Sequence, residues 1–364
     1  MLRIGLLTSW ETRCGIADYS RHLVAALRER GDAEVQVVPA TFLRSPRAVY
    51  AGMGAALNSA DVAHVQHSYA FFGGMQPLRA GWSAAADAIR RPLVVTVHEL
   101  DARGTGAHGV PPALEAAFKR GFNRRTFLHP AIRRWVVHAG PLREGLLELG
   151  AREARVLYRP MPVWPAPSPA PDPAPFRRTH RLIDRRALVI LGFLSRRKGY
   201  DVALAALKQL PADYVLVAAG GEHAADASGT GEWLRAAAAR LGVEERLRIT
   251  GFLEEGALEQ AAAAAEVVLA PFREMSGSAS IPFALARGKA VIASDLPAIG
   301  DLPCVRRVPP GDPGALAAAV LELGADPGAR AALEAAALRC AAERSFAALA
   351  ADLRALYQEL AEEG

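Results

Sequence analysis

The stretch LAPFREMSGSASIPFALARGKAVIASD, Leu269 to Asp295, decides the fold of this sequence. It begins at the end of an apolar run, Val267–Ala270, and passes through a polar turn into a helical pattern over Ile281–Arg287. Gly288 stops that pattern, and a second apolar run follows at Ala290–Ala293. An apolar run, a loop of small residues, a helix, a glycine and another apolar run predict one βαβ unit of a parallel sheet.

The loop of this unit suits an anion. Ser276, Gly277 and Ser278 stand just before the predicted helix, so hydroxyls and unpaired backbone N–H groups gather at a helix N-terminus. Such a terminus carries partial positive charge and binds phosphate or diphosphate. The alternative is a serine-rich N-cap that faces water.

Bulk composition indicates an ordinary globular protein of two domains. Of its residues, 51% are hydrophobic and 22% are charged, as in ordinary globular proteins. Its length of 364 residues exceeds what one hydrophobic core usually organises. The net charge of +5 is too mild to indicate nucleic-acid binding without a basic stripe interleaved with stacking aromatics.

The cysteines and the N-terminus predict a compartment. Cys14, Cys304 and Cys340 are far apart and odd in number, so neither a disulfide framework nor a metal spacing is indicated. No apolar run approaches the length of a membrane span, and Leu2–Thr8 enters a strand without a signal peptide. We therefore expect a cytoplasmic protein.

Strand and helix patterns alternate along the chain in two halves. The predicted strands are Leu2–Thr8, Val35–Val38, Val62–Gln66, Leu93–Val97, Trp135–His138 and Arg155–Tyr158, then Ala187–Leu191, Tyr214–Ala219, Leu247–Thr250, Val267–Ala270 and Ala290–Ala293. Helical patterns lie between several of them and fill the C-terminal end. The alternation predicts an α/β protein of two facing Rossmann-like, doubly wound domains with a cleft between them. The dinucleotide fingerprint G-x-G-x-x-G is absent after the first strand, which counts against a nicotinamide enzyme.

A proline-rich segment separates the halves. Pro160–Pro175 contains eight prolines, which exclude a helix interior or a central strand and favour an interdomain linker over an ordinary loop. We expect domains at 1–165 and 166–345, with the helix at 346–364 packing back onto the first.

Candidate site residues follow strand ends in both halves. In the C-terminal half, Arg196, Arg197 and Lys198 stand between a strand and a helix, where cations can neutralise a diphosphate. The alternative is a solvated basic turn. Gly221 closes the next strand, and Phe252 follows another strand and can offer an apolar shelf to a nucleobase.

In the N-terminal half the candidates are histidines. His67 and His98 end neighbouring strands, where active-site residues collect. No carboxylate or cysteine completes a metal set, so we expect hydrogen-bonding roles. His64 lies inside its strand on the opposite face from His67 and is expected to be a core histidine.

In their order along the chain, these motifs resemble the GT-B glycosyltransferases of the family 4 type, which retain the anomeric configuration of a nucleotide-sugar donor. The matching pieces are Cys14–Tyr19, Val65–His67 with Phe72–Gly74, Val95–His98, Lys198-Gly199, Ala219–Gly221, Gly251-Phe252 and Gly288–Ser294. The resemblance implies that the N-terminal domain binds the acceptor and the C-terminal domain binds the nucleotide sugar, without a metal. It implies donor contacts at Gly15, Lys198 and either Arg196 or Arg197, and acceptor contacts at His67, Gly73 and Gly74. His98 would contact the transferred sugar.

The sequence departs from the family at two glutamates. The family places one glutamate at the sugar and another, eight positions later, at the ribose; counting back from Gly288 puts these positions at Met275 and Phe283. Glu274 lies beside the first position and is the candidate for sugar recognition, whereas no carboxylate stands at the second.

The predicted function is a retaining transfer of a sugar from a nucleotide-diphosphate sugar to a glycan, lipid-linked or small-molecule acceptor, with no permanently bound cofactor. A catalytically silent sugar-nucleotide or glycan-binding subunit, a sugar-nucleotide epimerase and a phosphorylase remain alternatives.

The segment Phe118–Trp135, here called the basic run, holds six cationic and four aromatic residues and no acid. It predicts peripheral contact with the anionic inner face of a membrane, or else a helix whose aromatics lie in the core.

Overall fold

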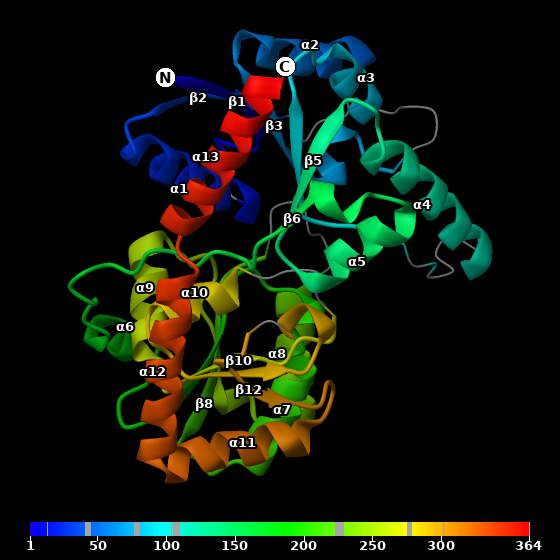
Figure 1. The fold of residues 1–364 in the computed structure, drawn as a ribbon. Helices are drawn as coiled ribbons and strands as arrows, with labels where there is room; N and C mark the ends of the chain where they lie inside the picture. Colours follow the sequence, from blue (N-terminus) through cyan, green and yellow to red (C-terminus); the bar gives the residue numbers. More distant parts are fainter. Residues whose placement is uncertain are drawn as a thin grey trace. The chain divides into compact units, whose positions relative to one another are not determined.

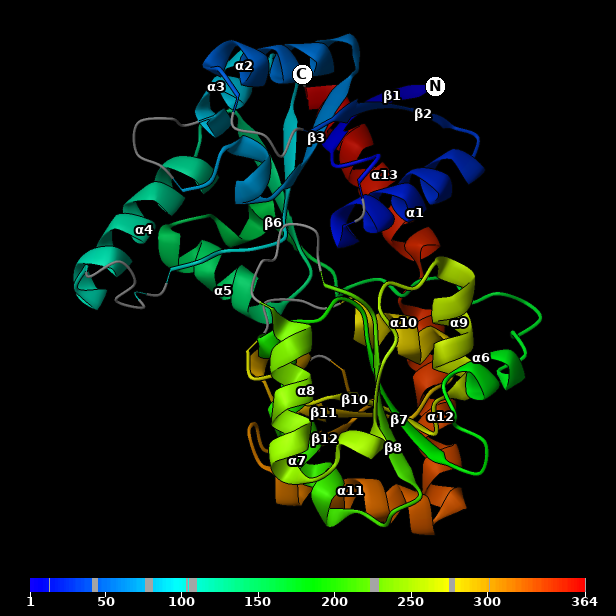
Figure 2. The same cartoon turned by 180° about the vertical axis from the view of Figure 1, so that it is seen from behind.

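The two halves of the chain fold into two units, each with its own parallel sheet (Figures 1 and 2). The computed structural model describes residues 1–12, 14–40, 45–75, 81–102, 104, 110–222, 229–274, 279–300 and 302–363. Unit 1 comprises Met1–Pro162 and Phe346–Gly364, and unit 2 comprises Val163–Ser345. The chain thus leaves unit 1 inside the proline-rich segment and returns to it for the last helix.

Unit 1 is built on a six-stranded parallel sheet in the order β2-β1-β3-β4-β5-β6. Its strands are β1 (Leu2–Thr8), β2 (Ala33–Pro39), β3 (Val62–His67), β4 (Leu93–Val97), β5 (Ile132–Val137) and β6 (Val156–Tyr158). Its helices are α1 (Gly15–Glu29), α2 (Arg47–Ala56), α3 (Gly81–Ala88), α4 (Pro112–Phe127), α5 (Gly140–Leu149) and α13 (Phe346–Glu363). The central strands β3 and β4 are buried along their whole length, as expected of a sheet covered on both faces.

The last helix completes unit 1. On α13 the residues Leu349, Leu353, Tyr357 and Leu360 are buried at helical spacing, so one face of the helix is apolar. That helix lies against α1 and contacts β3, as both views show (Figures 1 and 2). Burying a leucine side chain contributes about 2 kcal/mol, so this face attaches α13 firmly.

Unit 2 has a six-stranded parallel sheet in the order β12-β11-β10-β7-β8-β9. Its strands are β7 (Arg186–Leu191), β8 (Tyr214–Ala219), β9 (Leu247–Ile249), β10 (Val267–Ala270), β11 (Val291–Ser294) and β12 (Arg306–Val308). Its helices are α6 (Ala174–Thr179), α7 (Tyr200–Gln209), α8 (Thr230–Leu241), α9 (Glu255–Ala264), α10 (Ser280–Ala286), α11 (Pro313–Ala325) and α12 (Pro327–Glu343).

Alternate residues of the unit 2 strands fill two separate cores. Leu188 and Ile190 of β7 pack on the face covered by α7, α8 and α11, whereas Val189 and Leu191 pack on the face covered by α9, α10 and α12. This two-sided burial explains the continuous apolar runs in the sequence. The predicted doubly wound α/β fold is confirmed, including the βαβ unit formed by β10, α10 and β11.

Two features of the chain differ from the predictions. The edge strand β12 and the helices α2, α3 and α6 were not expected. The proline-rich segment is partly ordered into unit 2: Val163 and Trp164 are buried, and the N–H of Val163 donates to the carbonyl of Arg344 at 2.7 Å. The outgoing and returning chain segments therefore run side by side, with a β-bridge from Val163 to Ser345.

Candidate functional site

His98 stands at the carboxyl end of β4, at the centre of the unit 1 sheet. Its Nε2 lies 2.7 Å from Gln66 Oε1 on neighbouring β3, and the edge of Tyr19 packs against its ring at a centroid distance of 5.3 Å. Burial, with help from the nearby His138, holds the pKa of His98 well below its ordinary value. His98 is therefore a neutral hydrogen-bonding group on a half-buried strand end.

The residue after His98 is also held in place. Glu99 Oε1 accepts hydrogen bonds from Ser68 Oγ at 2.7 Å and from the backbone N–H of Tyr69 at 2.9 Å. These hydrogen bonds connect the segment after β3 with the segment after β4, so they fix the backbone next to His98 in position.

His64 is a core histidine, as predicted. It is fully buried on β3, with Nδ1 2.5 Å from Tyr357 Oη and Nε2 2.8 Å from Thr96 Oγ1. Burial lowers the pKa of His64 to about 3, so it is neutral at physiological pH.

The surroundings of His67 are apolar, and its acceptor contact remains a prediction. Its side chain is buried among aromatic rings, stacked on Phe72 and met edge-on by Tyr69, Trp82 and Phe127. Burial lowers its pKa to about 3. Although His67 ends its strand, the turn that follows covers it, so its side chain packs in the core.

The predicted glycines of unit 1 lie in two places. Gly15 opens α1 directly after the first strand's loop, and a Cβ built there would meet no atom within 4 Å. Gly73 and Gly74 end the short turn at Tyr69–Phe72, where Gly73 has a φ of +83° that glycine adopts without strain. Backbone conformation thus explains Gly73, while its acceptor contact and that of Gly74 remain predictions.

Lys198 lies at the carboxyl end of the unit 2 sheet, in a short turn between β7 and α7. Its ammonium group donates to the carbonyl of Leu191, the last residue of β7. Burial of the ammonium lowers the pKa of Lys198 to about 7. A lysine with that pKa is half charged near neutrality, and an anion beside it would favour the charged form.

The turn of Lys198 touches the loop that follows β10. The backbone N–H of Arg273 donates to the carbonyl of Arg197 at 2.9 Å, and a Cβ on Gly199 would lie 1.8 Å from the carbonyl oxygen of Pro271. Only glycine permits this approach. The sheet order places β7 beside β10, so the cationic turn and the start of the βαβ loop are neighbours.

The arginines of the turn are exposed, unlike Lys198. The guanidinium of Arg196 lies 5.0 Å above the ring of Trp233 on α8, an arrangement that keeps its charge at the sheet edge. Arg197 contributes its backbone to the contact with Arg273.

The loops after β8 and β9 line the same edge of the unit 2 sheet. The carbonyl of Gly221 accepts from the N–H of Leu194 at 2.8 Å, and a Cβ on Gly221 would lie 2.7 Å from the backbone nitrogen of Phe252. The ring of Phe252 is 43% exposed and lies 6.4 Å from that of Phe193. Two adjacent rings, one of them open to solvent, form a surface on which a planar base can stack.

The two glutamate positions of the βαβ unit have different surroundings. Glu274 is exposed after β10, whereas the predicted phosphate loop at Ser276, Gly277 and Ser278 lies outside the described residues. Phe283 is on α10, and the guanidinium of Arg287 lies 3.4 Å above its ring. Arg287 also pairs with the buried carboxylate of Glu259.

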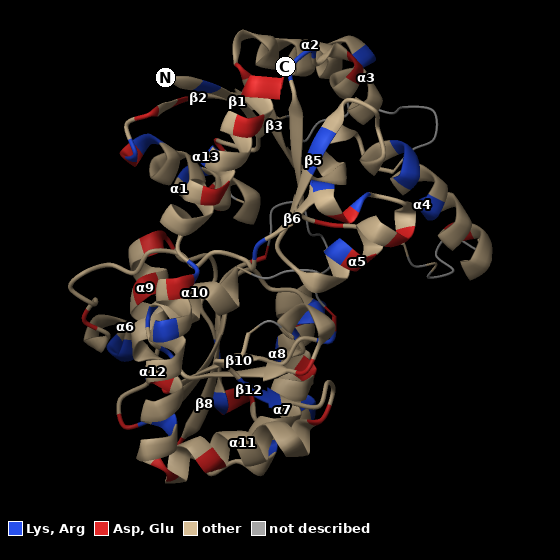
Figure 3. Ribbon diagram, viewed as in Figure 1, with Lys and Arg blue, Asp and Glu red and all other residues tan. Residues whose placement is uncertain are grey.

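The basic run divides between core and surface. Phe127 and Trp135 are buried, and Lys119 pairs with Asp101 and Glu115, each at 2.8 Å. Figure 3 shows the basic residues gathered along the C-terminal half of α4 and on β5. Fewer residues of the basic run are therefore available at the surface than the sequence suggests.

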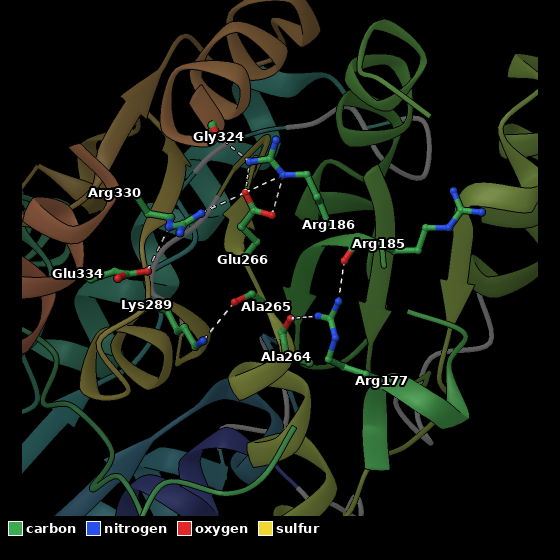
Figure 4. A network of polar contacts seen from close by, with 10 residues as sticks. All are labelled: Arg177, Arg185, Arg186, Ala264, Ala265, Glu266, Lys289, Gly324, Arg330 and Glu334. Carbon is green, nitrogen blue, oxygen red and sulfur yellow. Dashed lines mark hydrogen bonds and ion pairs between the residues drawn. The ribbon is translucent and has the colours of Figure 1, made fainter. Parts of the chain in front are cut away.

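A second polar cluster in unit 2 lies at the amino ends of the strands and not at the site edge. Glu266, just before β10, accepts from Arg186 at the start of β7 and from Arg330 on α12, the latter at 3.2 Å (Figure 4). Arg186 also donates to the carbonyl of Gly324 at 3.0 Å. These contacts connect two helices with two strands, which is a structural role.

Among the described residues, no group of three or more histidine, cysteine, aspartate or glutamate side chains has the spacing to hold a metal ion. Each sheet instead presents one chemically distinct edge. Unit 1 offers a neutral imidazole, and unit 2 offers a half-buried lysine, two arginines and an aromatic surface. Sequence reasoning did not identify the contribution of Gln66, although the pattern His64-Val65-Gln66 places two polar side chains on one face of β3.

Comparison with known protein families gives a match within the second half of the chain. Residues 185–326 match the model of the family described as glycosyl transferases group 1. No protein with a curated description matches the sequence.

Solved structures resemble the whole chain. Anabaena HepE in complex with UDP-glucose has 17% identity and a TM-score of 0.76, covering 100% of this chain and 99% of that chain. Sucrose-phosphate synthase from Thermosynechococcus elongatus has 19% identity and a TM-score of 0.75, with 100% of both chains covered. WaaG, a glycosyltransferase involved in lipopolysaccharide biosynthesis, has 14% identity and a TM-score of 0.68, covering 97% of this chain and 98% of that chain. These likenesses establish the GT-B architecture.

Proposed function

We propose a donor, a mechanism and an acceptor class for this chain, a glycosyltransferase whose residues 185–326 form a group 1 domain within a GT-B fold. The proposed reaction transfers a hexose from a UDP-sugar with retention of the anomeric configuration. The observation that carries it is the edge of unit 2, where Lys198, the arginines beside it and the exposed ring of Phe252 combine charge for a diphosphate with a stacking surface for a base. UDP is the proposed nucleotide because HepE is similar and was solved with UDP-glucose.

The first step in the mechanism is to stabilise the leaving diphosphate. Charge accumulates on the diphosphate as the bond to the anomeric carbon breaks, so a desolvated ammonium beside it favours the transition state. Lys198 is the half-buried cation of its turn, with Arg196 and Arg197 more exposed. In this proposal the side-chain cations supply the charge compensation without a resident metal.

The second step is recognition of the transferred sugar. Positive charge develops at the anomeric carbon, and a hydroxyl of the sugar that donates to a neutral imidazole becomes a better electron donor to the ring. The imidazole of His98 is neutral, because burial keeps its pKa well below the ordinary value. We assign Glu274 to another sugar hydroxyl, and Gly15 to the close approach of the diphosphate and the acceptor. A covalent nucleophile is not part of the proposal.

The donor assignment is tested by calorimetric titration with UDP, GDP, ADP and dTDP, followed by UDP release from UDP-glucose in the presence of candidate acceptors. We expect UDP to bind tightest and Lys198→Ala to weaken UDP by tenfold or more while affecting uridine much less, because a charge-assisted contact is worth about 1.5 to 3 kcal/mol. Lys208→Ala, on the exposed face of α7, is the matched control. Equal losses for UDP and uridine would remove Lys198 from the phosphates. A parent protein that binds UDP but transfers to no acceptor would favour the binding-subunit alternative.

The proposed acceptor is carried by an anionic membrane. Three apolar side chains just before and in the first half of α4 are exposed: Val110 by 41%, Leu114 by 64% and Phe118 by 42%. Leu114 and Phe118 are one helical turn apart, and the exposed Arg120 and Arg125 follow on the same helix. An apolar stripe beside exposed arginines fits an interface of acyl chains and anionic headgroups. In the described part of the chain, none of the helices combines the length and apolarity needed to cross a bilayer.

Vesicle co-sedimentation tests this surface. The parent protein should sediment with vesicles that contain anionic phosphatidylglycerol and not with neutral phosphatidylcholine vesicles, and Leu114→Glu should abolish sedimentation. Leu338→Glu makes the same exposed change on α12 and should leave it intact. Equal sedimentation of the Leu114 variant and the parent would contradict the role of α4.

A further inference from the structure

A buried hydrogen-bond chain connects the C-terminal helix with His98. Tyr357 Oη of α13 lies 2.5 Å from His64 Nδ1, Gln66 Nε2 lies 3.5 Å from His64 Nε2, and Gln66 Oε1 lies 2.7 Å from His98 Nε2. Tyr357, His64 and Gln66 are fully buried, whereas His98 is half-buried at the strand end. The chain therefore extends from the interior of unit 1 to the side chain that faces the sugar in the proposed function.

From His64 onward each member of this chain restricts the next one, and Tyr357 supplies the hydrogen-bond partner of His64 Nδ1. A neutral imidazole has one N–H and one lone pair, and burial keeps His64 neutral. When Nδ1–H of His64 donates to Tyr357, the Nε2 lone pair accepts from Thr96 Oγ1 at 2.8 Å and faces the amide NH₂ of Gln66. The Gln66 oxygen is then turned toward His98, where it can only accept.

The opposite arrangement reverses every bond. If His64 carried its proton on Nε2, an N–H would face the NH₂ of Gln66, and the amide would turn its oxygen toward His64. Gln66 would then donate to His98, which would have to carry its own proton on Nδ1. The state of His98 thus depends on groups that never touch a substrate.

We infer that Gln66, His64 and Tyr357 are positioning residues that hold His98 as the tautomer protonated on Nε2 and so leave its Nδ1 lone pair for a sugar hydroxyl. This inference rests on the proposed role of His98 at the sugar. In the other tautomer, His98 would present an N–H in place of a lone pair, and a hydroxyl that donates its proton would lose its acceptor. An equal mixture of tautomers would also place half of the protein in the wrong state before substrate binds.

The test reads the tautomer of His98 directly, without relying on activity. Full-length protein labelled with ¹⁵N-histidine is examined by long-range ¹H–¹⁵N NMR, and His98 is assigned by the signals that disappear in His98→Ala. Gln66→Met removes the amide at similar volume, and Tyr357→Phe removes only a hydroxyl. Tyr200→Phe is the matched control, because Tyr200 is as fully buried as Tyr357 and lies on α7 of unit 2, outside the chain.

We expect His98 of the parent protein and of Tyr200→Phe to show one protonated nitrogen, Nε2. Gln66→Met and Tyr357→Phe should show a mixture of tautomers. With an identified donor, kcat of Gln66→Met should fall about tenfold at unchanged donor KM, the effect of losing one hydrogen bond that orients the imidazole. A single Nε2–H tautomer in both Gln66→Met and Tyr357→Phe would overturn the inference, and either variant suffices if the other does not fold. A shifted tautomer with unchanged kcat would support the positioning chain and instead count against His98 in the proposed function.

Discussion

When the pH of a donor-binding experiment is raised through neutrality, Lys198 of the free protein loses its proton and its positive charge. The donor diphosphate then binds beside a neutral lysine. Burial lowers the pKa of this lysine to about 7 in the free protein, because loss of contact with water disfavours the charged ammonium. A diphosphate beside the lysine favours the ammonium and raises its pKa in the complex. Above about pH 7, donor binding must therefore be accompanied by proton uptake, and the affinity must fall as the pH rises.

The size of the effect follows from that pKa. At about pH 8 only about a tenth of the free protein carries the ammonium, whereas at about pH 6 nine tenths of it does. The dissociation constant for the donor should then rise about tenfold between these two pH values, which corresponds to roughly 1.4 kcal/mol. At about pH 8 each bound donor should take up about 0.9 proton.

Isothermal titration calorimetry with UDP-glucose measures both quantities. UDP-glucose is preferred over UDP because its diphosphate is esterified at both ends and keeps the same charge across this range. Titrations in two buffers of different ionisation enthalpy give the proton uptake, and Lys198→Arg is the control because arginine stays charged. A donor affinity that is flat from about pH 6 to about pH 8, with heats independent of buffer, would refute the reasoning.

Three further outcomes follow from the described contacts. His98→Ala should remain folded and bind UDP normally but lose about 10²-fold or more in turnover, the scale of one transition-state contact; transfer at the parent rate would exclude it from the reaction centre. Glu274→Gln should lower the ratio of kcat/KM between UDP-glucose and UDP-galactose more than it weakens UDP, and an unchanged ratio would count against sugar recognition. Glu266→Ala leaves part-buried Arg186 without its paired carboxylate and Arg330 with only Glu334, and should lower the free energy of unfolding by about 1 to 3 kcal/mol. Glu322→Ala, at an exposed pair with Arg306, should cost less than about 1 kcal/mol in the same urea denaturation, and equal losses would contradict the assigned structural role.

Strands with buried faces were predictable from sequence because their apolar runs are continuous. The strands Leu2–Thr8, Leu93–Val97 and Tyr214–Ala219 have the predicted bounds. The edge strand at Arg306–Val308 contains two arginines and only one apolar residue, so its sequence gives no strand signal. Its place in the sheet depends on pairing with β11, which a local pattern does not contain.

The location of a site residue was predictable from sequence where it depends only on which strand the residue follows. Lys198 and His98 follow strands and lie at the expected edges. His67 also ends a strand, but the aromatic turn after it and Trp82 on α3 enclose it, and that cover is invisible in the strand pattern. The link between Tyr357 and His64 joins residues almost 300 positions apart, so no reading of neighbouring residues could have found it.

The discontinuous course of unit 1 sets an order of events during synthesis. The sheet strands of this unit leave the ribosome first, yet its last helix is separated from them by the whole of unit 2. At about 5 to 20 residues per second, the intervening stretch of roughly 180 residues takes on the order of 10 to 40 s to translate. Throughout that interval the apolar face that receives Leu353 and Tyr357 is uncovered in the nascent chain, and a chaperone that shields apolar surface would act on it. A chain released before its final helix would also lack the hydroxyl next to His64, so an interrupted translation product should be inactive even with unit 2 intact.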